Sequence, residues 1–391
     1  MKIYKYLIIG GGMTTKAAID GIRSLDADGS IGVISEEKYK PYERPPLSKG
    51  LWKDKRMDDI FFEMDAPNVS FHLSTTAKNV DRDKKVVTDS KNHQYKYSKL
   101  LIATGVTPKK ISDESERIIY YKNLDDFKKL RQLTKKYSNF GIIGGGFIGS
   151  EIAAALTNTE KKVTMFFIEK GVGGLIFPEK LAKHLNDYYE NHGVSILSET
   201  SVTKIHKEEK KIHVQTMNKD YSFDVLVIGV GAHPDMELLK SIHIDLESGV
   251  KVDQYLRTSD PNIYAAGDVA NFYSPDLEKR IRVEHEDGAY TQGEIAGKNM
   301  TGAEEPYNHL PFFYSDLYDY GYEAIGTLNS NLEMIEDWKK EFDEGVVYYR
   351  ENGIVVGVLL WNVWDQVDNA RELIASKKKM NKDELCGYLP K

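Results

Sequence analysis

Short apolar runs that stop at glycine recur along this 391-residue chain. One run, at residues 6–9, ends on three consecutive glycines, and a second, at residues 140–143, ends in the same way. Each is followed by a helix-like stretch and then by another apolar run that leads to an acid. Continuous apolar runs bounded by turn residues are typical of strands buried in a parallel sheet. The pattern therefore predicts two βαβ units, at residues 6–36 and 140–169.

Both predicted units continue in the same order. Short alternating runs follow the acid, and an apolar strand that closes on glycine comes after them, at residues 100–105 and at residues 224–231. Alternation is typical of antiparallel strands with one face exposed, so we expect a small antiparallel insert in each copy. The expected helices cover residues 14–25 and 150–158, and the expected insert strands cover residues 70–75, 85–88, 94–97, 194–197, 202–206 and 211–215.

The glycines and acids of these units predict a ligand. Glu36 lies 26 residues after Gly10, and Glu169 lies 25 residues after Gly144. Glycine lets the backbone turn tightly and approach a pyrophosphate, which then sits at the positive end of the following helix. A carboxylate at the end of the second strand accepts hydrogen bonds from ribose hydroxyls. One glycine triplet would be weak evidence, but two complete units predict two dinucleotide-binding domains.

Two further segments belong to neither repeat. An apolar strand at residues 263–266 ends on Gly267-Asp268, where a carboxylate can receive the polyol hydroxyls of a cofactor. From residue 302 onward the composition changes, with aromatic residues at 312–314 and two strand-like runs joined by Asn352-Gly353. The Asn-Gly step is a strong hairpin signal. A closing helix is expected at residues 366–379, so this part is predicted to be a separate α+β domain.

Composition and charge exclude several function classes. The formal net charge of −7 gives no basic face for nucleic acid, and the longest apolar runs fall far short of the ~18 residues of a membrane-spanning helix. Cys386 is the only cysteine, so no intrachain disulfide can form. A chain with almost no cysteine suits a reducing compartment, and we expect a cytoplasmic location.

The sequence resembles the two-dinucleotide-domain flavoprotein reductases, namely the ferredoxin and rubredoxin reductases and their relative, apoptosis-inducing factor. The hexapeptide Arg-Pro-Pro-Leu-Ser-Lys at residues 44–49 is its most discriminating segment. Other matching segments lie at residues 8–12, 103–105, 143–151, 265–268, 282–285, 315–317 and 321–326. The resemblance implies FAD on the first dinucleotide domain, a nicotinamide nucleotide on the second, and hydride transfer between them.

The fold class that follows is α/β, with two Rossmann-like, three-layer dinucleotide-binding domains of the glutathione-reductase type and a C-terminal α+β domain. The expected FAD-binding domain is discontinuous and covers residues 1–111 and 239–301. The expected NAD(H)-binding domain covers residues 112–238, and the C-terminal domain covers residues 302–391.

The resemblance also implies site residues. For FAD they are Gly10, Gly12, Glu36, Arg44, Lys49, Thr104, Gly105, Gly267, Asp268, Glu284, His285 and Tyr314. For the nicotinamide nucleotide they are Gly144, Gly146, Phe147, Gly149, Glu151, Glu169 and Gly231.

Three of these residues are expected to act in catalysis. Lys49 would lie near flavin N5 and stabilise the negative charge of the reduced ring. Glu151 would pair with Lys49 and orient the nicotinamide amide, and Phe147 would cover the flavin until the nicotinamide displaces it. The simpler interpretations are a surface lysine after a Pro-Pro turn, an acid stabilised by a helix N-terminus, and ordinary packing of a helix on a sheet.

The sequence departs from the family pattern at two positions. Thr15 stands where the family has a small residue that packs helix against strand, so that contact is expected to be looser. Tyr314 stands where apoptosis-inducing factor has tryptophan. No metal site is expected, because the run from Glu284 to Asp287 consists of consecutive residues, which point in different directions and cannot converge on one ion.

The cysteine count narrows the predicted reaction. The disulfide reductases of this superfamily carry cysteines shortly after the first acid, and residues 38–44 here contain none. We therefore expect electrons to pass from the flavin to an external carrier such as rubredoxin or ferredoxin. Glu169 favours NADH over NADPH because a carboxylate repels a 2′-phosphate, although Lys170 beside it weakens this preference.

Two other functions stay open at this stage. One is an NADH oxidase or quinone reductase that uses a small acceptor and no protein partner. The other is an NADH-sensing flavoprotein that dimerises on reduction, like apoptosis-inducing factor. The C-terminal aromatic cluster suits either a flavin shield or the face of a homodimer.

Overall fold

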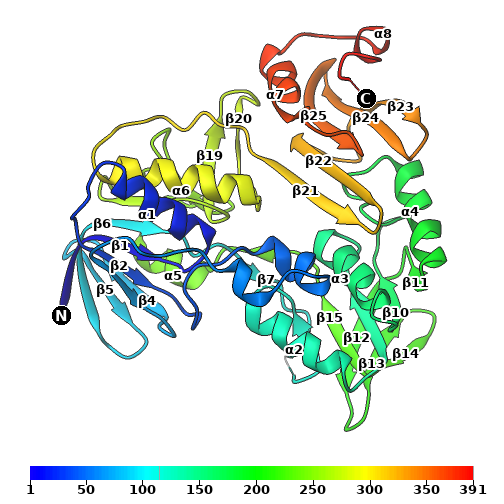
Figure 1. Cartoon of the computed structure of the whole chain (residues 1–391), viewed down its shortest axis with the longest axis horizontal. Helices are drawn as coiled ribbons and strands as arrows, with labels where there is room; N and C mark the ends of the chain where they lie inside the picture. The colour runs from blue at the N-terminus through cyan, green and yellow to red at the C-terminus, as the bar shows by residue number, and fades with distance from the viewer. Residues whose placement is uncertain (114, 391) are drawn as a thin grey trace. The chain divides into compact units, whose positions relative to one another are not determined.

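The structure is a computed structural model that describes residues 1–113 and 115–390 (Figure 1). The chain forms two compact units, each assembled from separate stretches of sequence. The first unit contains Met1–Arg44, Arg56–Thr107 and His233–Phe313, and the second contains Pro45–Lys55, Pro108–Ala232 and the chain from Tyr314 onward. The chain passes between the units near β7 (Thr107–Pro108) and β16 (Ala232–His233).

A parallel sheet forms the centre of the first unit. Its order is β3 (Val69–His72), β2 (Ile31–Ile34), β1 (Lys2–Ile9) and β6 (Gln94–Ile102), and β18 (Ile263–Ala265) also pairs with β6. Ile9 pairs with Ile34 and with Ile102, and Ile102 pairs with Ala265. The carboxyl ends of β1, β6 and β18 therefore meet at one edge of the sheet.

The predicted antiparallel insert is present, with two corrections. It consists of β4 (Ala77–Asp81) and β5 (Val86–Asp89), which pair with each other and with the first half of β6. The runs at residues 94–97 and 100–103 are one strand, β6, because its first half continues beyond the buried sheet into the insert. The run at residues 70–75 is β3, a parallel edge strand, because its register is set by β2. Alternation alone cannot distinguish these two strand types.

Two helices of the first unit lie in direct backbone contact, as Figure 1 shows for α1 (Met13–Arg23) and α6 (Glu286–Met300). A methyl group on Gly21 would lie 2.1 Å from the carbonyl O of Glu294, and one on Gly297 would lie 2.2 Å from that of Ala18. Only glycine permits this approach. The third helix of the unit is α5 (Met236–Ile242), and a small sheet contains β17 (Val250–Lys251), β19 (Ala270–Ser274) and β20 (Lys279–Ile281).

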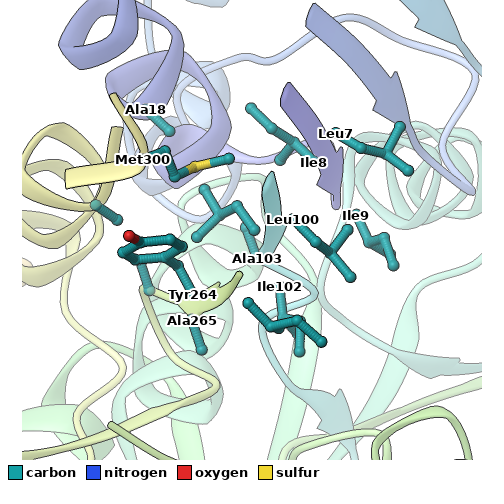
Figure 2. Close-up of a cluster of buried hydrophobic side chains, with 14 of the residues drawn as sticks. Leu7, Ile8, Ile9, Ala18, Leu100, Ile102, Ala103, Tyr264, Ala265 and Met300 are labelled. Atoms are coloured by element: carbon teal, nitrogen blue, oxygen red, sulfur yellow. The ribbon is translucent and has the colours of Figure 1, made fainter. Parts of the chain in front are cut away.

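The core of the first unit lies between these helices and the parallel sheet. Figure 2 shows side chains from β1, β6 and β18 packed together with Ala18 of α1 and Met300 of α6. Leu7, Ile8 and Leu100 are fully buried there. Each such side chain contributes about 1.5–3 kcal/mol by leaving water. The core therefore holds the strand ends, where the glycines lie, in a fixed arrangement.

The second unit contains a second parallel sheet. Its order is β11 (Val194–Leu197), β10 (Lys162–Phe166), β9 (Asn139–Ile143), β15 (Val225–Ile228) and β8 (Ile118–Tyr120). Its helices are α2 (Leu124–Thr134), α3 (Phe147–Thr157) and α4 (Glu179–Asn191), and the antiparallel insert contains β12 (Val202–Lys207), β13 (Ile212–Thr216) and β14 (Asp220–Phe223). The run at residues 194–197 is β11, so it also belongs to the parallel sheet and not to the insert.

The C-terminal part of the chain forms an antiparallel sheet. The order is β21 (Phe312–Leu317), β22 (Tyr320–Gly326), β25 (Ile354–Trp361), β24 (Glu344–Glu351) and β23 (Glu333–Lys340), followed by α7 (Val367–Ser376) and α8 (Lys382–Leu385). Asn352 and Gly353 both have positive φ, as the tight hairpin predicted between β24 and β25 requires. Within the described residues, no helix has the length and apolar character needed to cross a membrane.

Candidate functional site

The first glycine of each repeat is required by the fold. Gly10 has φ +131° and Gly144 has φ +116°. A methyl group on Gly10 would lie 2.0 Å from the carbonyl O of Ala103, and one on Gly144 would lie 2.2 Å from that of Gly229. In both repeats the turn therefore presses against the end of a neighbouring strand, and the two turns are built alike.

The second glycine of each repeat leaves space in front of a helix. Gly12 caps α1 and Gly146 caps α3, both with extended backbone. Among the described residues, a methyl group on Gly146 would meet no atom within 4 Å, and one on Gly12 would approach only the Arg44 side chain, at 3.7 Å. The first turns of α1 and α3 contain no acid. The N–H groups of a first helical turn, the helix dipole and an open approach together suit an anion such as a pyrophosphate.

The third position differs between the repeats. Gly149 lies so close to the turn that a methyl group on it would be 2.0 Å from the carbonyl O of Gly144. In the first repeat Thr15 is fully buried, and its hydroxyl donates a hydrogen bond to the carbonyl O of Gly10 at 3.0 Å. The contact that was expected to be looser is thus bridged by a hydrogen bond.

Several buried polar atoms among the described residues of the first unit lack a hydrogen-bond partner. Among the described residues, Thr104 Oγ1, Gln292 Nε2 and His285 Nδ1 are buried and have no hydrogen-bond partner. The amide O of Gln292 accepts a hydrogen bond from the N–H of Gly267 at 2.9 Å, so its free amide N lies beside the predicted Gly267 position. Unpaired buried polar groups are costly, and a polar cofactor would satisfy them. These residues therefore fit FAD.

Other predicted FAD residues of the first unit lie near one another. Arg44 is close to Gly12, forms an ion pair with Glu37 and interacts electrostatically with Asp268. The Arg282 guanidinium donates hydrogen bonds to the Glu284 carboxylate at 2.9 Å and to the Asp268 carbonyl O at 3.0 Å.

The two acids that are expected to bind ribose both follow a strand of a parallel sheet. Glu36 is exposed directly after β2, and Glu169 is half-buried shortly after β10.

Burial lowers the pKa of His285 to about 4, and its ring lies 4.6 Å from the ring of Phe313. His285 is therefore neutral at pH 7.

A buried carboxylate of the second unit, that of Glu151, is surrounded by hydrogen-bond donors. This residue is only 5% exposed, and its carboxylate accepts hydrogen bonds from Ser48 Oγ and Ser315 Oγ, both at 2.5 Å, and from Lys49 Nζ. The Lys49 ammonium also lies 5.5 Å from the centre of the Tyr314 ring. A buried carboxylate is tolerated only when it is paired and hydrogen-bonded. Here its three donors come from two segments that are both far from Glu151 in the sequence.

Local packing holds the segment that carries Ser48 and Lys49. It comprises two 3-10 turns, Pro45–Leu47 and Gly50–Trp52. The Leu47 carbonyl accepts hydrogen bonds from Trp52 Nε1 at 2.8 Å and from the Tyr121 hydroxyl. The Trp52 ring packs edge-on against Phe127 and lies beneath the Arg131 guanidinium. A rigid segment therefore presents the lysine to the carboxylate.

The remaining predicted residues of the second unit lie at its surface. Phe147 is 42% exposed and Ile148 is 37% exposed at the start of α3, and Tyr314 is 38% exposed. Gly231 has φ +90°, a conformation that favours glycine. Large exposed apolar side chains beside a helix N-terminus fit a face that a bound aromatic ring would cover.

Sequence reasoning missed Ser48, Ser315 and Gln292. Ser48 and Ser315 lie inside segments that carried the resemblance, but a serine in such a segment gives no signal of its own. Gln292 lies within a polar helix, where a buried glutamine cannot be recognised. Within the run from Glu284 to Asp287, Asp287 accepts hydrogen bonds from His309 and from the Phe312 N–H.

Two dinucleotide-binding folds of the same build, one of them lined by unpaired buried polar atoms, define a flavoprotein that works with a nicotinamide nucleotide. The family model described as pyridine nucleotide-disulphide oxidoreductase matches residues 4–293, and the chain belongs to this family. A model of the C-terminal part of apoptosis-inducing factor matches residues 296–341 and 333–376. The protein is an oxidoreductase with FAD and NAD(P)H as cofactors, as predicted.

Several relatives are similar over most of their length. Apoptosis-inducing factor 1 of Dictyostelium discoideum is 32% identical over 96% of this chain and 79% of its own. Monodehydroascorbate reductase of Solanum lycopersicum is 31% identical over 83% and 82% of the two chains, and rubredoxin-NAD(+) reductase of Pseudomonas putida is 27% identical over 91% and 92%. Putidaredoxin reductase, solved in a covalent complex with putidaredoxin, has a TM-score of 0.89 at 23% identity over 97% and 95%, which shows the same fold.

Proposed function

We propose that this protein takes electrons from NADH and passes them to an external protein carrier of the rubredoxin or ferredoxin kind, without a redox-active disulfide. The observation that carries the proposal is the Lys49–Glu151 pair in a chain with one cysteine. A positive charge held by a buried carboxylate suits electron transfer through the flavin itself. Relatives named rubredoxin-NAD(+) reductase and ferredoxin--NAD(+) reductase support a small carrier as acceptor.

Each residue of the cluster has a defined task in this proposal. FAD, when bound, would supply the redox chemistry, namely hydride acceptance and electron transfer. Lys49 places its charge where negative charge develops, which lowers the energy of that state. Glu151, fixed by the two serines, holds Lys49 and accepts a hydrogen bond from the nicotinamide amide. Phe147 shields the site from water until the nicotinamide replaces it.

Two features at the surface of the second unit support a preference for NADH, namely the carboxylate of Glu169 and the ion pair of Lys170. Glu169 would accept hydrogen bonds from the adenosine ribose and repel a 2′-phosphate. Lys170 could attract that phosphate, but its ammonium forms an ion pair with Glu179 at 2.7 Å, and Lys183 pairs with the same carboxylate at 2.7 Å. Glu179 thus draws Lys170 toward α4 and supports selection of NADH.

The decisive experiment is anaerobic stopped-flow absorbance of the purified protein with NADH and, separately, with NADPH. We expect fast bleaching of the visible flavin band, faster with NADH, followed by rapid reoxidation when rubredoxin or ferredoxin is added. The relevant control is Glu169→Gln, which should narrow the difference between the two nucleotides. A colourless protein that releases no flavin on denaturation would refute the proposal.

A small acceptor is the first alternative. The relatives named monodehydroascorbate reductase favour it, because their acceptor is a small molecule. It predicts steady turnover with monodehydroascorbate, a quinone or oxygen, unchanged when a carrier protein is added. Fast reoxidation by the carrier and slow reoxidation by all three small acceptors would reject it.

An NADH sensor is the second alternative. The match of residues 296–341 and 333–376 to the C-terminal part of apoptosis-inducing factor favours it. It predicts negligible turnover with every acceptor and a change from monomer to dimer when NADH is added, measured by gel filtration. An unchanged elution volume together with brisk turnover would remove this function.

A further inference from the structure

Two histidines and a glutamate meet on the insert hairpin of the second unit. His206 of β12 pairs directly with His213 of β13, and Glu208 follows His206 by two residues. Directly paired residues of an antiparallel hairpin share a face, and Glu208, just beyond the end of β12, has its carboxylate near both rings. The hairpin therefore gathers three metal-binding side chains on one face.

The ligand atoms of these side chains lie close together. Glu208 Oε2 is 3.2 Å from His213 Nε2, and Glu208 Oε1 is 3.8 Å from His206 Nε2. One ligand atom from each of the three residues falls within 4.8 Å of the others, and no other group of this kind occurs among the residues that the structure describes. The two imidazole rings are nearly parallel, with 12° between their planes and 4.8 Å between their centres.

One of these atoms is buried without a hydrogen bond. His213 Nε2 is shielded from solvent and, within the described part of the chain, has no partner with acceptable hydrogen-bond geometry. The side chain as a whole is 27% exposed, so the atom is covered by its neighbours in the cluster and not by a deep core. A buried nitrogen without a partner is costly, and a cation between it and Glu208 would satisfy it.

The hairpin tip that carries the cluster is held in place. The Arg117 guanidinium donates hydrogen bonds to the carbonyl groups of Glu209 at 3.0 Å and Lys210 at 2.8 Å. The Glu208 N–H donates to the Lys211 carbonyl at 2.9 Å. The backbone that carries the three side chains is therefore held in place, so that a cation would have to reorient only the side chains, which lowers the cost of binding.

One neighbouring lysine, Lys211, is paired with another carboxylate. The ammonium of Lys211, whose backbone faces Glu208, is drawn away by an ion pair with Asp224 at 2.6 Å. Glu208 thus contributes a carboxylate whose charge is not matched by that lysine.

We propose that His206, Glu208 and His213 bind a divalent transition metal and that this metal is Zn²⁺. Ligand atoms at tetrahedral angles around Zn²⁺ lie about 3.4 Å apart, close to the two spacings in the cluster. Two imidazoles and one carboxylate suit Zn²⁺ and its neighbours Ni²⁺ and Cu²⁺, whereas Mg²⁺ and Ca²⁺ prefer oxygen ligands. Water completes the fourth position, and the ion links β12 to β13.

The site is independent of the proposed function. None of its residues was assigned to the flavin or the nicotinamide nucleotide, and Zn²⁺ undergoes no redox change. Loss of the metal should therefore leave the rate of NADH oxidation unchanged.

The test is Zn²⁺ binding to the chelator-treated flavoprotein, measured by competition with a chromophoric chelator at one neutral pH. We expect one Zn²⁺ per chain in the wild type, with a higher thermal midpoint in its presence. Affinity should fall by about tenfold or more in His206→Gln and in His213→Gln, and less in Glu208→Gln. Because all three side chains are partly exposed, the variants should fold.

The matched control is His243→Asn. His243 is an exposed histidine with positive φ in the other unit, a conformation that asparagine tolerates. This variant should bind Zn²⁺ as the wild type does. Absence of stoichiometric binding, or equal affinity in wild type, His206→Gln and His213→Gln, would overturn the site. Mg²⁺ displacing Zn²⁺ at comparable concentration would overturn the assignment of the metal class.

Discussion

In the proposed function, Glu151 is the residue of the second unit on which the expected chemistry depends most directly. It is nearly fully buried, and its three donors come from the Pro45–Lys55 segment and from β21. Lys49 supplies the compensating charge, whereas Ser48 and Ser315 fix the direction of the carboxylate. The serines are therefore positioning residues, and their effect should appear in a rate more than in stability.

The first prediction concerns Ser315→Ala. It removes one charge-assisted hydrogen bond and allows the carboxylate to turn, so we expect flavin reduction by NADH to slow about tenfold, equivalent to ~1.4 kcal/mol. Stopped-flow reduction under saturating NADH measures it. The control is Ser376→Ala in α7, whose hydroxyl donates a hydrogen bond to the Leu373 carbonyl at 2.7 Å and accepts one from the Lys378 N–H at 3.4 Å. A raised KM with an unchanged limiting rate would contradict the positioning role.

The second prediction concerns His285. Its folded-state pKa of about 4 lies below the ordinary value of 6.5 because the ring is buried. Between pH 4 and pH 6.5 this histidine binds more protons in the unfolded chain than in the folded one. The contribution of the neutral ring to the unfolding free energy is therefore fully present above pH 6.5 and is lost as the pH falls toward 4. The loss from this group is roughly 3 kcal/mol. Denaturant unfolding of flavin-free protein at several pH values should show a flatter pH dependence in His285→Asn, and identical slopes would reject this origin.

At the scale of elements, the first and second glycines of each turn differ in their surroundings. The first is required by the fold, and the second is expected to leave space for the ligand. Gly144 is required by a neighbouring backbone, whereas a methyl group on Gly146 would have no atom of the described residues within 4 Å. The same turn thus carries one glycine that the fold requires and one that we expect to leave room for the nucleotide. A pair of substitutions can distinguish them.

The third prediction compares Gly144→Ala with Gly146→Ala. The first places a methyl group 2.2 Å from the Gly229 carbonyl at positive φ, so unfolding free energy should fall by at least ~2 kcal/mol. The second should change stability by no more than about 1 kcal/mol, yet raise the KM for NADH about tenfold by blocking the pyrophosphate. Thermal unfolding and steady-state kinetics measure both. Normal NADH kinetics in Gly146→Ala would exclude pyrophosphate binding there.

Prediction of elements from the sequence succeeded where local chemistry was decisive. The two βαβ units, the Asn352-Gly353 hairpin and the closing helix were predicted because glycine, turn residues and periodicity act over a few positions. β3 and β11 were wrongly grouped with the antiparallel inserts, because strand direction is set by a partner far along the chain.

At the scale of the whole molecule, the single cysteine is the strongest constraint on the reaction. Cys386 is exposed near the end of the chain, and its backbone N–H bonds to the Lys382 carbonyl. The residues between β2 and the Arg44 segment contain no thiol. Electron transfer is thus expected to need no sulfur chemistry.

The fourth prediction is that Cys386→Ser leaves both reactions intact. Removal of an exposed, unpaired thiol should change unfolding free energy by no more than about 0.5 kcal/mol. NADH oxidation and acceptor reduction should remain at the wild-type rate, measured with and without a thiol-blocking reagent on the wild type. Loss of turnover in the variant or after blocking would show that the thiol takes part.

The sequence by itself determined the two nucleotide-binding repeats, their glycines and the absence of a dithiol, because these features depend on spacing and residue count. Tertiary structure alone decided which side chains meet. Ser48, Ser315 and Glu151 are more than 100 residues apart from one another, and only folding brings their atoms together. His206 and His213 become neighbours only through strand register, since a shift of one residue would turn one of them to the opposite face.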